Sequence, residues 1–181
     1  MSRTHAPLAL LVALTLALTG CGGAQKMLGK AGPSPAPTAA FASEEEALAA
    51  AVAVYDRFRS IGDEIGHDGG RDAERLEEVA TGGFLKVSVE GFTGWIDKGW
   101  HQVGSSTFRD VTVQQYSDGP ADAVVLYLCD DISEVDVLDE TGASVASPDR
   151  PDTNYLQVSF DVGKDGVLRV SDSQRWDERT C

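Results

Sequence analysis

The chain is poor in the residues from which most catalytic centres and metal sites are built. Its 181 residues include only three histidines, three cysteines and two methionines. It has no CxxC or HExxH motif, no serine in a nucleophile elbow, and no glycine pattern with the spacing of a phosphate-binding loop. With no motif for a zinc centre, a serine hydrolase or a nucleotide-binding enzyme, we expect no metal and no cofactor.

Positive charge is also scarce. Lysine and arginine number 15 against 29 aspartates and glutamates, which gives a formal net charge of −14. Phosphate backbones and anionic lipid headgroups repel a chain of this charge. We therefore expect no nucleic-acid binding, and any attachment to a membrane must come from something other than electrostatic attraction.

Such an attachment is indicated at the N-terminus. Arg3 precedes an apolar run from Leu8 to Leu18, which is too short to span a bilayer of about 30 Å but has the build of a secretory signal. The run ends in Leu18-Thr19-Gly20-Cys21, which resembles the bacterial lipobox. The resemblance covers residues 1–21 and implies that 1–20 are a signal peptide, that Cys21 is diacylated, and that the lipid anchors the protein to the membrane.

The composition divides the rest of the chain in two. Residues 21–42 combine the lipidated cysteine with a stretch rich in Gly, Ala, Ser and Pro, which is typical of a flexible tether. Residues 43–181 are long enough for a single domain with a real core. We expect this domain to lie outside the cell, on the outer face of the cytoplasmic membrane.

Two cysteines remain if Cys21 carries lipid. Cysteines of an extracytoplasmic protein are most often paired, so we hypothesise a Cys129–Cys181 disulfide that pins the last residue of the chain. The alternative is a cysteine nucleophile, which would need His67 or His101 as its base, and neither histidine lies in a supporting motif.

The first half of the domain has helical periodicity. Ser43 and Glu46 form a capping box, and apolar residues at steps of three and four predict a helix to about Ile61, stopped by Gly62. The segment GDEIGHDGG (62–70) is expected to be a loop. A short helix over 72–80, with Leu76 and Val79 inward, precedes a break at 82–83 and a third amphipathic segment over 84–96.

From residue 105 the period changes to two. Strands are predicted over 108–116, 123–132, 154–162 and 167–176, with a short hairpin around the turn 139–142. Helices followed by strands indicate an α+β fold, with N-terminal helices packed on a curved antiparallel sheet of four or more strands. Leu156, Val158 and Phe160 should face the helices, leaving the weakly apolar Tyr155, Gln157 and Ser159 outside.

This order of elements resembles the nuclear transport factor 2-like fold, also called the cystatin-like cone. Residues 121–181 resemble more closely a group of secreted actinobacterial lipoproteins. The resemblance rests on LYLCDDISEVDVLDETG (126–142), the loop SPDRP (147–151), the strand LQVSF and a final tryptophan-bearing strand that ends in Cys181. Cone-like domains include polyketide cyclases, isomerases, dehydratases and proteins without activity, so the fold does not select a function.

The acids after Cys129 are the strongest candidates for a charged site: Asp130, Asp131, Glu134, Asp136, Asp139 and Glu140. A calcium loop would need glycine at its sixth position, and none falls there. Alternation along a strand also divides the acids between two faces. We therefore interpret the acids as a solvated sheet edge that resists strand-to-strand aggregation.

A catalytic carboxylate would need an apolar setting that raises its pKa. The candidates are Asp130, Asp172 and Asp110, although no spacing links them. His101 is a candidate helper of such an acid. Tyr55 and Tyr116 could also help. The candidates for lining a ligand pocket are Tyr55, Trp100, Tyr116 and Trp176, and for the two tryptophans core packing is the favoured interpretation.

The best-supported function from sequence is a non-catalytic module that binds an envelope protein or a small molecule. One alternative is a small-molecule enzyme of the isomerase, dehydratase or hydrolase type, with its site between helices and sheet. Another is a module that dimerises through the open sheet face, although the weakly apolar outer face favours a monomer. The orientation of Asp130, either between helices and sheet or toward water, bears directly on the choice between a binding module and an enzyme.

Overall fold

The computed structural model describes residues 41–176 and 179–181. The signal peptide, Cys21 and nearly all of the tether predicted above lie outside these residues. The elements are α1 (Glu44–His67), a 3-10 helix η1 (Ala73–Glu78), α2 (Gly82–Ile96), β1 (His101–Val103), β2 (Thr107–Tyr116), β3 (Val124–Asp131), β4 (Asp136–Leu138), β5 (Thr153–Val162) and β6 (Leu168–Arg175). No helix within this part of the chain is both long and apolar enough to cross a membrane.

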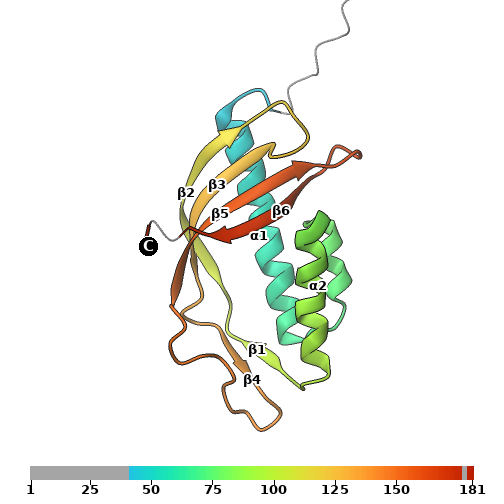
Figure 1. The fold of residues 1–181 in the computed structure, drawn as a ribbon, viewed down its shortest axis with the longest axis vertical. Coiled ribbons are helices and arrows are strands. Elements are labelled where there is room, and N and C mark those ends of the chain that lie inside the picture. The colour runs from blue at the N-terminus through green and yellow to red at the C-terminus, as the bar shows by residue number, and fades with distance from the viewer. Residues whose placement is uncertain (1–40, 177–178) are drawn as a thin grey trace, which may run out of the picture. The chain divides into compact units, whose positions relative to one another are not determined.

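Four long strands form one antiparallel sheet in the order β2-β3-β5-β6. The sheet is curved, α1 and α2 lie on one side of it, and the C-terminus lies on the other (Figure 1). The predicted α+β fold of helices followed by a curved antiparallel sheet is confirmed, and it is cone-like.

The core fills the space between α1 and the sheet. Alternate residues of β3 and β5, including Leu126, Leu128 and Phe160, are fully buried against Ala51 and Tyr55 of α1. A second cluster joins the end of α1 to η1, where the predicted inward positions of Leu76 and Val79 are confirmed. Burial of one face of each element against the other is the main stabilising contribution to this layer.

The first helix begins as predicted but ends later. Ser43 Oγ accepts a hydrogen bond from the Glu46 backbone amide at 3.2 Å, as a capping box requires. The prediction that Gly62 stops the helix is wrong, because α1 continues to His67. Within this extension Gly66 allows close packing, because a Cβ at 66 would lie 2.6 Å from Gln102 Oε1.

Two other boundaries differ from the sequence prediction. The predicted break between helices at 82–83 lies a few residues earlier, because η1 ends at Glu78 and α2 begins at Gly82. The turn at 139–142 forms, and the Val145 amide donates to the Val137 carbonyl at 2.8 Å across the expected short hairpin. The pairing of β4 with β1 was not predicted. Gly104 allows this pairing, because its φ of 72° and its contact with the Glu134 carbonyl oxygen leave no room for a Cβ.

Candidate functional site

Asp130 points inward from β3, toward α1. It is buried, with 5% of its surface exposed. Asp130 Oδ1 accepts a hydrogen bond from the Tyr55 hydroxyl at 3.4 Å and lies 3.4 Å from Arg59 Nε. Tyr55 and Arg59 are four residues apart and share one face of α1. We call these three residues the Asp130 cluster. For Asp130, the predicted solvated sheet edge is therefore wrong.

The cluster has the electrostatics of a buried, partly compensated charge. Burial raises the pKa of the Asp130 carboxyl above its ordinary value, and the Arg59 guanidinium and the Tyr55 hydrogen bond oppose this rise without cancelling it. Burial also raises the pKa of Tyr55, so its hydroxyl stays protonated at neutral pH. The Tyr55 hydroxyl and the Arg59 guanidinium, both on α1, contact the Asp130 carboxylate on β3. These contacts join the helix to the sheet.

We predict that Asp130→Asn changes how stability depends on pH. Because the folded protein holds the Asp130 proton more tightly than the unfolded chain, its contribution to stability is complete below the unfolded pKa, near 3.8, and is lost as pH rises through the raised folded-state pKa. Urea unfolding of wild type should show this loss, and D130N should lack it. Asp56→Asn, on an exposed position of α1, controls for net charge; identical profiles for wild type and D130N would contradict the prediction.

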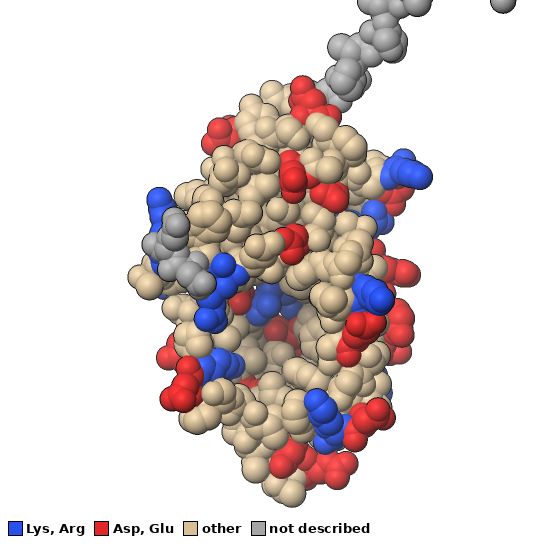
Figure 2. Space-filling view, viewed as in Figure 1, with Lys and Arg blue, Asp and Glu red and all other residues tan. Residues whose placement is uncertain are grey.

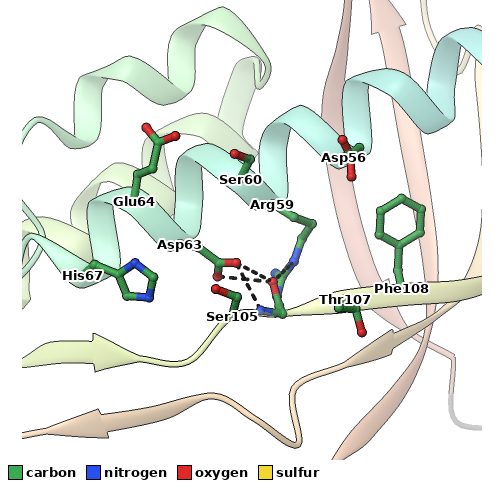
Figure 3. A pocket seen from close by; sticks show the side chains of 10 residues that line it. Asp56, Arg59, Ser60, Asp63, Glu64, His67, Ser105, Thr107 and Phe108 are labelled. Carbon is green, nitrogen blue, oxygen red and sulfur yellow. Dashed lines mark hydrogen bonds between the residues drawn. The ribbon is translucent and has the colours of Figure 1, made fainter.

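A pocket of about 520 Å³ lies beside the cluster, between α1 and the start of β2. Its lining from α1 is Asp56, Arg59, Ser60, Asp63, Glu64 and His67, and residues 105–108 line the other side. The steps of three and four place these side chains on one helix face (Figure 3). Figure 2 shows the molecule hollowed on this face, with side chains of both signs within the hollow. We call it the α1–β2 pocket.

Hydrogen bonds fix one wall of the α1–β2 pocket. Arg59 Nε donates to Ser106 Oγ at 2.9 Å, and the Ser106 backbone amide donates to Asp63 Oδ2 at 3.1 Å. Gln102 Nε2 donates to Asp63 Oδ1 at 2.7 Å. Asp130 does not line the pocket and reaches it only through Arg59. The wall is therefore polar and formed before any ligand arrives.

The other two candidate acids do not join Asp130. Asp110 is exposed on β2, has a φ of 56° at a register shift of that strand, and forms an ion pair with Arg109. Asp172 on β6 accepts a hydrogen bond from Gln174 Nε2 at 2.6 Å. Neither lines the α1–β2 pocket. The three candidate acids therefore lie apart, and of these only Asp130 is buried.

The predicted aromatic pocket is also divided. Tyr55 is a core residue, and Tyr116 is exposed at the end of β2. Trp100 and Trp176 line two separate pockets. Trp176 packs on the outer sheet face, where its ring centroid lies 5.5 Å from that of Tyr127. His101, the candidate helper, lies on β1 beside Trp100 and away from Asp130.

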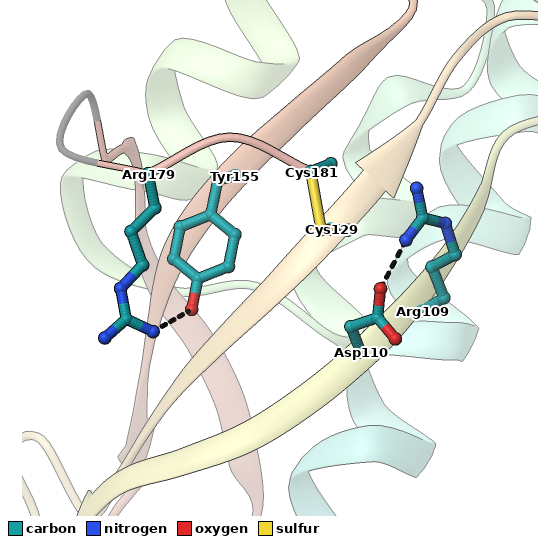
Figure 4. The surroundings of a disulfide bond; sticks show 6 residues. All are labelled: Arg109, Asp110, Cys129, Tyr155, Arg179 and Cys181. Carbon is teal, nitrogen blue, oxygen red and sulfur yellow. Dashed lines mark hydrogen bonds and ion pairs between the residues drawn. A yellow bond between two sulfur atoms is a disulfide. The ribbon is translucent and has the colours of Figure 1, made fainter.

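A disulfide joins Cys129 to Cys181, with the two Cα atoms 5.7 Å apart. Cys129 lies on the sheet face opposite Asp130, since successive side chains of a strand alternate. The bond holds the last residue of the chain against this outer face, near Tyr155 and Arg179 (Figure 4). With both sulfurs in the bond, neither cysteine is a free nucleophile.

Two of the remaining acids of 130–140, Asp131 and Asp139, bond within their own turns. Asp131 Oδ1 accepts from the Ser133 amide at 3.0 Å, and hydrogen bonds from Ser133 lower the pKa of Asp131. Asp139 Oδ1 accepts from the Thr141 amide at 2.8 Å, and bonding to Thr141 likewise lowers the pKa of Asp139. Across residues 41–176 and 179–181, no group of three His, Cys, Asp or Glu residues is placed to hold a metal ion.

The sequence reasoning missed the α1–β2 pocket. Its signal was present as a stripe of polar residues at 56, 59, 60, 63 and 67, opposite the apolar face of the same helix. The last two positions of this stripe lie beyond the expected stop at Gly62, which hid its continuity. The partners Gln102 and Ser106 could not be found, because they approach only in the folded chain.

Comparisons with solved structures found several chains that are similar to this one. The chain is similar to the intermembrane-space region of the chloroplast protein ARC6, at TM-score 0.51 and 14% identity over 71% of this chain and 95% of that one. It is also similar to Aln2 from a Streptomyces species, at TM-score 0.44 and 22% identity over 75% and 94%. A protein from Catenulispora acidiphila gives TM-score 0.41 and 14% identity over 72% and 94%.

The similarity to the ARC6 region is one of fold alone. No protein-family model matches the chain, and the search of curated proteins found no match either. Function therefore has to be argued from the residues of the site.

Proposed function

We propose that the protein is a lipid-anchored binding module of the cell envelope, held by a flexible tether on the outer face of the cytoplasmic membrane. In this proposal the α1–β2 pocket binds a small polar ligand without transforming it. The anchor rests on the lipobox ending in Cys21. The resemblance of residues 121–181 to secreted actinobacterial lipoproteins supports the same location.

The observation that carries the binding role is the preformed polar wall of the α1–β2 pocket. Ligand pockets usually have volumes of about 300–1,000 Å³ and a few fixed polar groups, and this pocket has about 520 Å³. Arg59 and Asp63 are each held by hydrogen bonds to Ser106. Side chains fixed in this way lose little conformational entropy when a ligand arrives.

The position of Asp130 supports binding over catalysis. A general base must come within hydrogen-bonding reach of the proton that it removes. Asp130 lies behind Arg59, and its Oδ1 already faces the Arg59 guanidinium and the Tyr55 hydroxyl. Freeing it would break its contacts with the partly buried Arg59 guanidinium and with the Tyr55 hydroxyl, which costs energy.

Nuclear magnetic resonance of the isotope-labelled full chain, carrying Cys21→Ala for solubility, tests the binding role against a library of small polar metabolites. We expect chemical-shift changes concentrated at amides of 56–67 and 105–108. Ser60→Trp should fill the pocket and remove them, whereas Gln114→Trp, at an exposed position of β2, should not. Shifts that persist in S60W, or a library that leaves these amides unmoved, would count against the proposal.

A second candidate function is a small-molecule enzyme of the isomerase, dehydratase or hydrolase type. The observation that favours it is the raised pKa of buried Asp130 next to a pocket. In this case Asp130 would act as a base, and the protein should exchange the α-hydrogens of some enolisable ketone for deuterium. Exchange that disappears in Asp130→Asn would establish the enzyme and displace the binding proposal.

A further inference from the structure

We propose that a second pocket, at the far end of α1, binds a small organic ammonium ion. The pocket has a volume of about 370 Å³ and lies among the ends of α1 and α2, β1 and the turn after β4. Its lining includes Trp95, Trp100, Asp68 and Glu140. We call it the tryptophan pocket. The inference does not depend on the proposed function of the α1–β2 pocket.

The two pockets are neighbours but separate. His67 contributes to both linings. Its Nε2 lies 2.7 Å from the carbonyl oxygen of Gly104, and this contact ties the end of α1 to the segment between β1 and β2. Trp95 and Trp100 line the tryptophan pocket but not the α1–β2 pocket.

Trp100 already holds an ammonium group. Lys98 Nζ lies 4.2 Å from the centroid of the Trp100 ring, which is the geometry of a cation–π contact. The second ring is fixed in place, since Trp95 packs edge-to-face on Phe92 with centroids 5.4 Å apart. Aromatic faces of this kind attract quaternary ammonium groups, which are bulky, weakly hydrated cations.

Two carboxylates and one guanidinium line the tryptophan pocket. Asp68 and Glu140 contribute carboxylates, and α1 ends beside the pocket at His67 and α2 at Ile96. The carbonyl end of a helix carries a partial negative charge of about one half. Arg71 also lines the pocket, but its Nη1 donates to the Asp68 carbonyl oxygen at 2.8 Å and so lies against the end of α1.

The backbone at the end of α2 positions Trp100 beside Glu140. The amides of Gly99 and Trp100 donate to the carbonyls of Ile96 and Trp95 at 3.3 and 3.1 Å, as in a Schellman motif. Gly99 has a φ of 63°, and a Cβ there would lie 2.7 Å from Glu140 Cδ. Glycine at 99 therefore both ends the helix and leaves room for the Glu140 carboxylate beside Trp100.

Lys98 acts as an internal competitor in this arrangement. Its ammonium group occupies one face of the Trp100 ring, and its positive charge beside the pocket repels an incoming cation. Removal of Lys98 should therefore strengthen ligand binding, whereas a site that recognised anions would lose affinity. The direction in which affinity changes when Lys98 is removed therefore distinguishes an ammonium site from an anion site.

The test uses the full chain in a non-ionic maltoside detergent and isothermal titration with choline. The control ligand is 3,3-dimethylbutan-1-ol, which has the shape of choline without its charge. We expect choline to bind at least about tenfold more tightly than this alcohol. Equal binding of the two, or no binding of choline, would overturn the proposal.

Variants locate the site. Glu140→Gln should weaken choline binding about tenfold and reduce its salt dependence, and Lys98→Gln should tighten it about threefold. Trp100→Leu should abolish binding, and Trp100→Phe, which keeps a ring, should bind with intermediate affinity if the leucine variant fails to fold. Val87→Ser, at an exposed position of α2, should leave binding unchanged. Weaker binding in K98Q would overturn the proposal.

The ammonium group could belong to a free solute or to a lipid headgroup. The full chain carrying Cys21→Ala, which lacks the predicted anchor, is mixed with phosphatidylcholine vesicles and, as a control, with phosphatidylglycerol vesicles. If the protein floats with phosphatidylcholine vesicles but not with phosphatidylglycerol vesicles, and free choline releases it, the ammonium group belongs to the lipid headgroup. Choline binding without flotation identifies a free ion, and either result supports an ammonium site.

Discussion

Replacing Cys21 with alanine is expected to remove all covalent lipid from the protein. The lipobox places Cys21 where the diacylglycerol would be attached, and no other cysteine follows an apolar run of this kind near the N-terminus. Each buried methylene of an acyl chain contributes about 0.8 kcal/mol, so two chains hold a protein durably on a membrane. With a net charge of −14, the chain has no electrostatic attraction to anionic lipid that could replace them.

The measurement is metabolic labelling with an alkyne-bearing palmitate, followed by partition between detergent and water. Wild type should carry the label and enter the detergent phase, whereas C21A should carry none. Cys181→Ser is the matched control, since it removes a thiol and should keep the full label. Label retained in C21A would exclude the lipobox assignment and with it the proposed anchoring.

Loss of the Cys129–Cys181 disulfide should lower the free energy of unfolding by about 4 kcal/mol. The bond joins residues 52 positions apart, and closing a loop of this length removes about that much conformational freedom from the unfolded chain. Cys181→Ser is the variant of choice, because Cys181 is exposed and its replacement opens no cavity. The same loss should occur when wild type is reduced.

Urea unfolding with and without a dithiol reductant provides the measurement. Reductant should destabilise wild type to the level of C181S and should leave C181S unchanged. Intact-mass analysis should show wild type gaining the mass of two hydrogen atoms on reduction. If wild type and C181S unfold at the same urea concentration, the bond has no part in stability.

Most of the fold could be predicted because its signals are local. The capping box at Ser43, the period of three and four in α1 and the period of two in β5 each identify an element from adjacent residues. Gly62 misled because glycine lowers helix propensity only by about 1 kcal/mol, and burial of Ile61 and Ile65 on either side of it favours continuation of the helix. The pairing of β1 with β4 depends on contacts more than thirty residues apart, which no local pattern encodes.

The candidate site was less predictable for the same reason. Strand alternation could show that Asp130 and Cys129 face opposite sides, but not which side the helices cover. The partners of Asp130 lie 71 and 75 positions earlier in the chain, at Arg59 and Tyr55. The pocket-lining side of α1 can be recognised only in the folded chain, where the segment 105–108 lies across it.

The opposite orientations of Cys129 and Asp130 have a consequence for the accuracy of strand pairing. A one-residue slip of β3 against β5 would turn the carboxylate outward and the thiol into the core. Cys181, on the outer face, could then no longer reach its partner. The oxidised bond therefore excludes a one-residue slip, and free thiols at Cys129 and Cys181 in the purified protein would reveal such a slip.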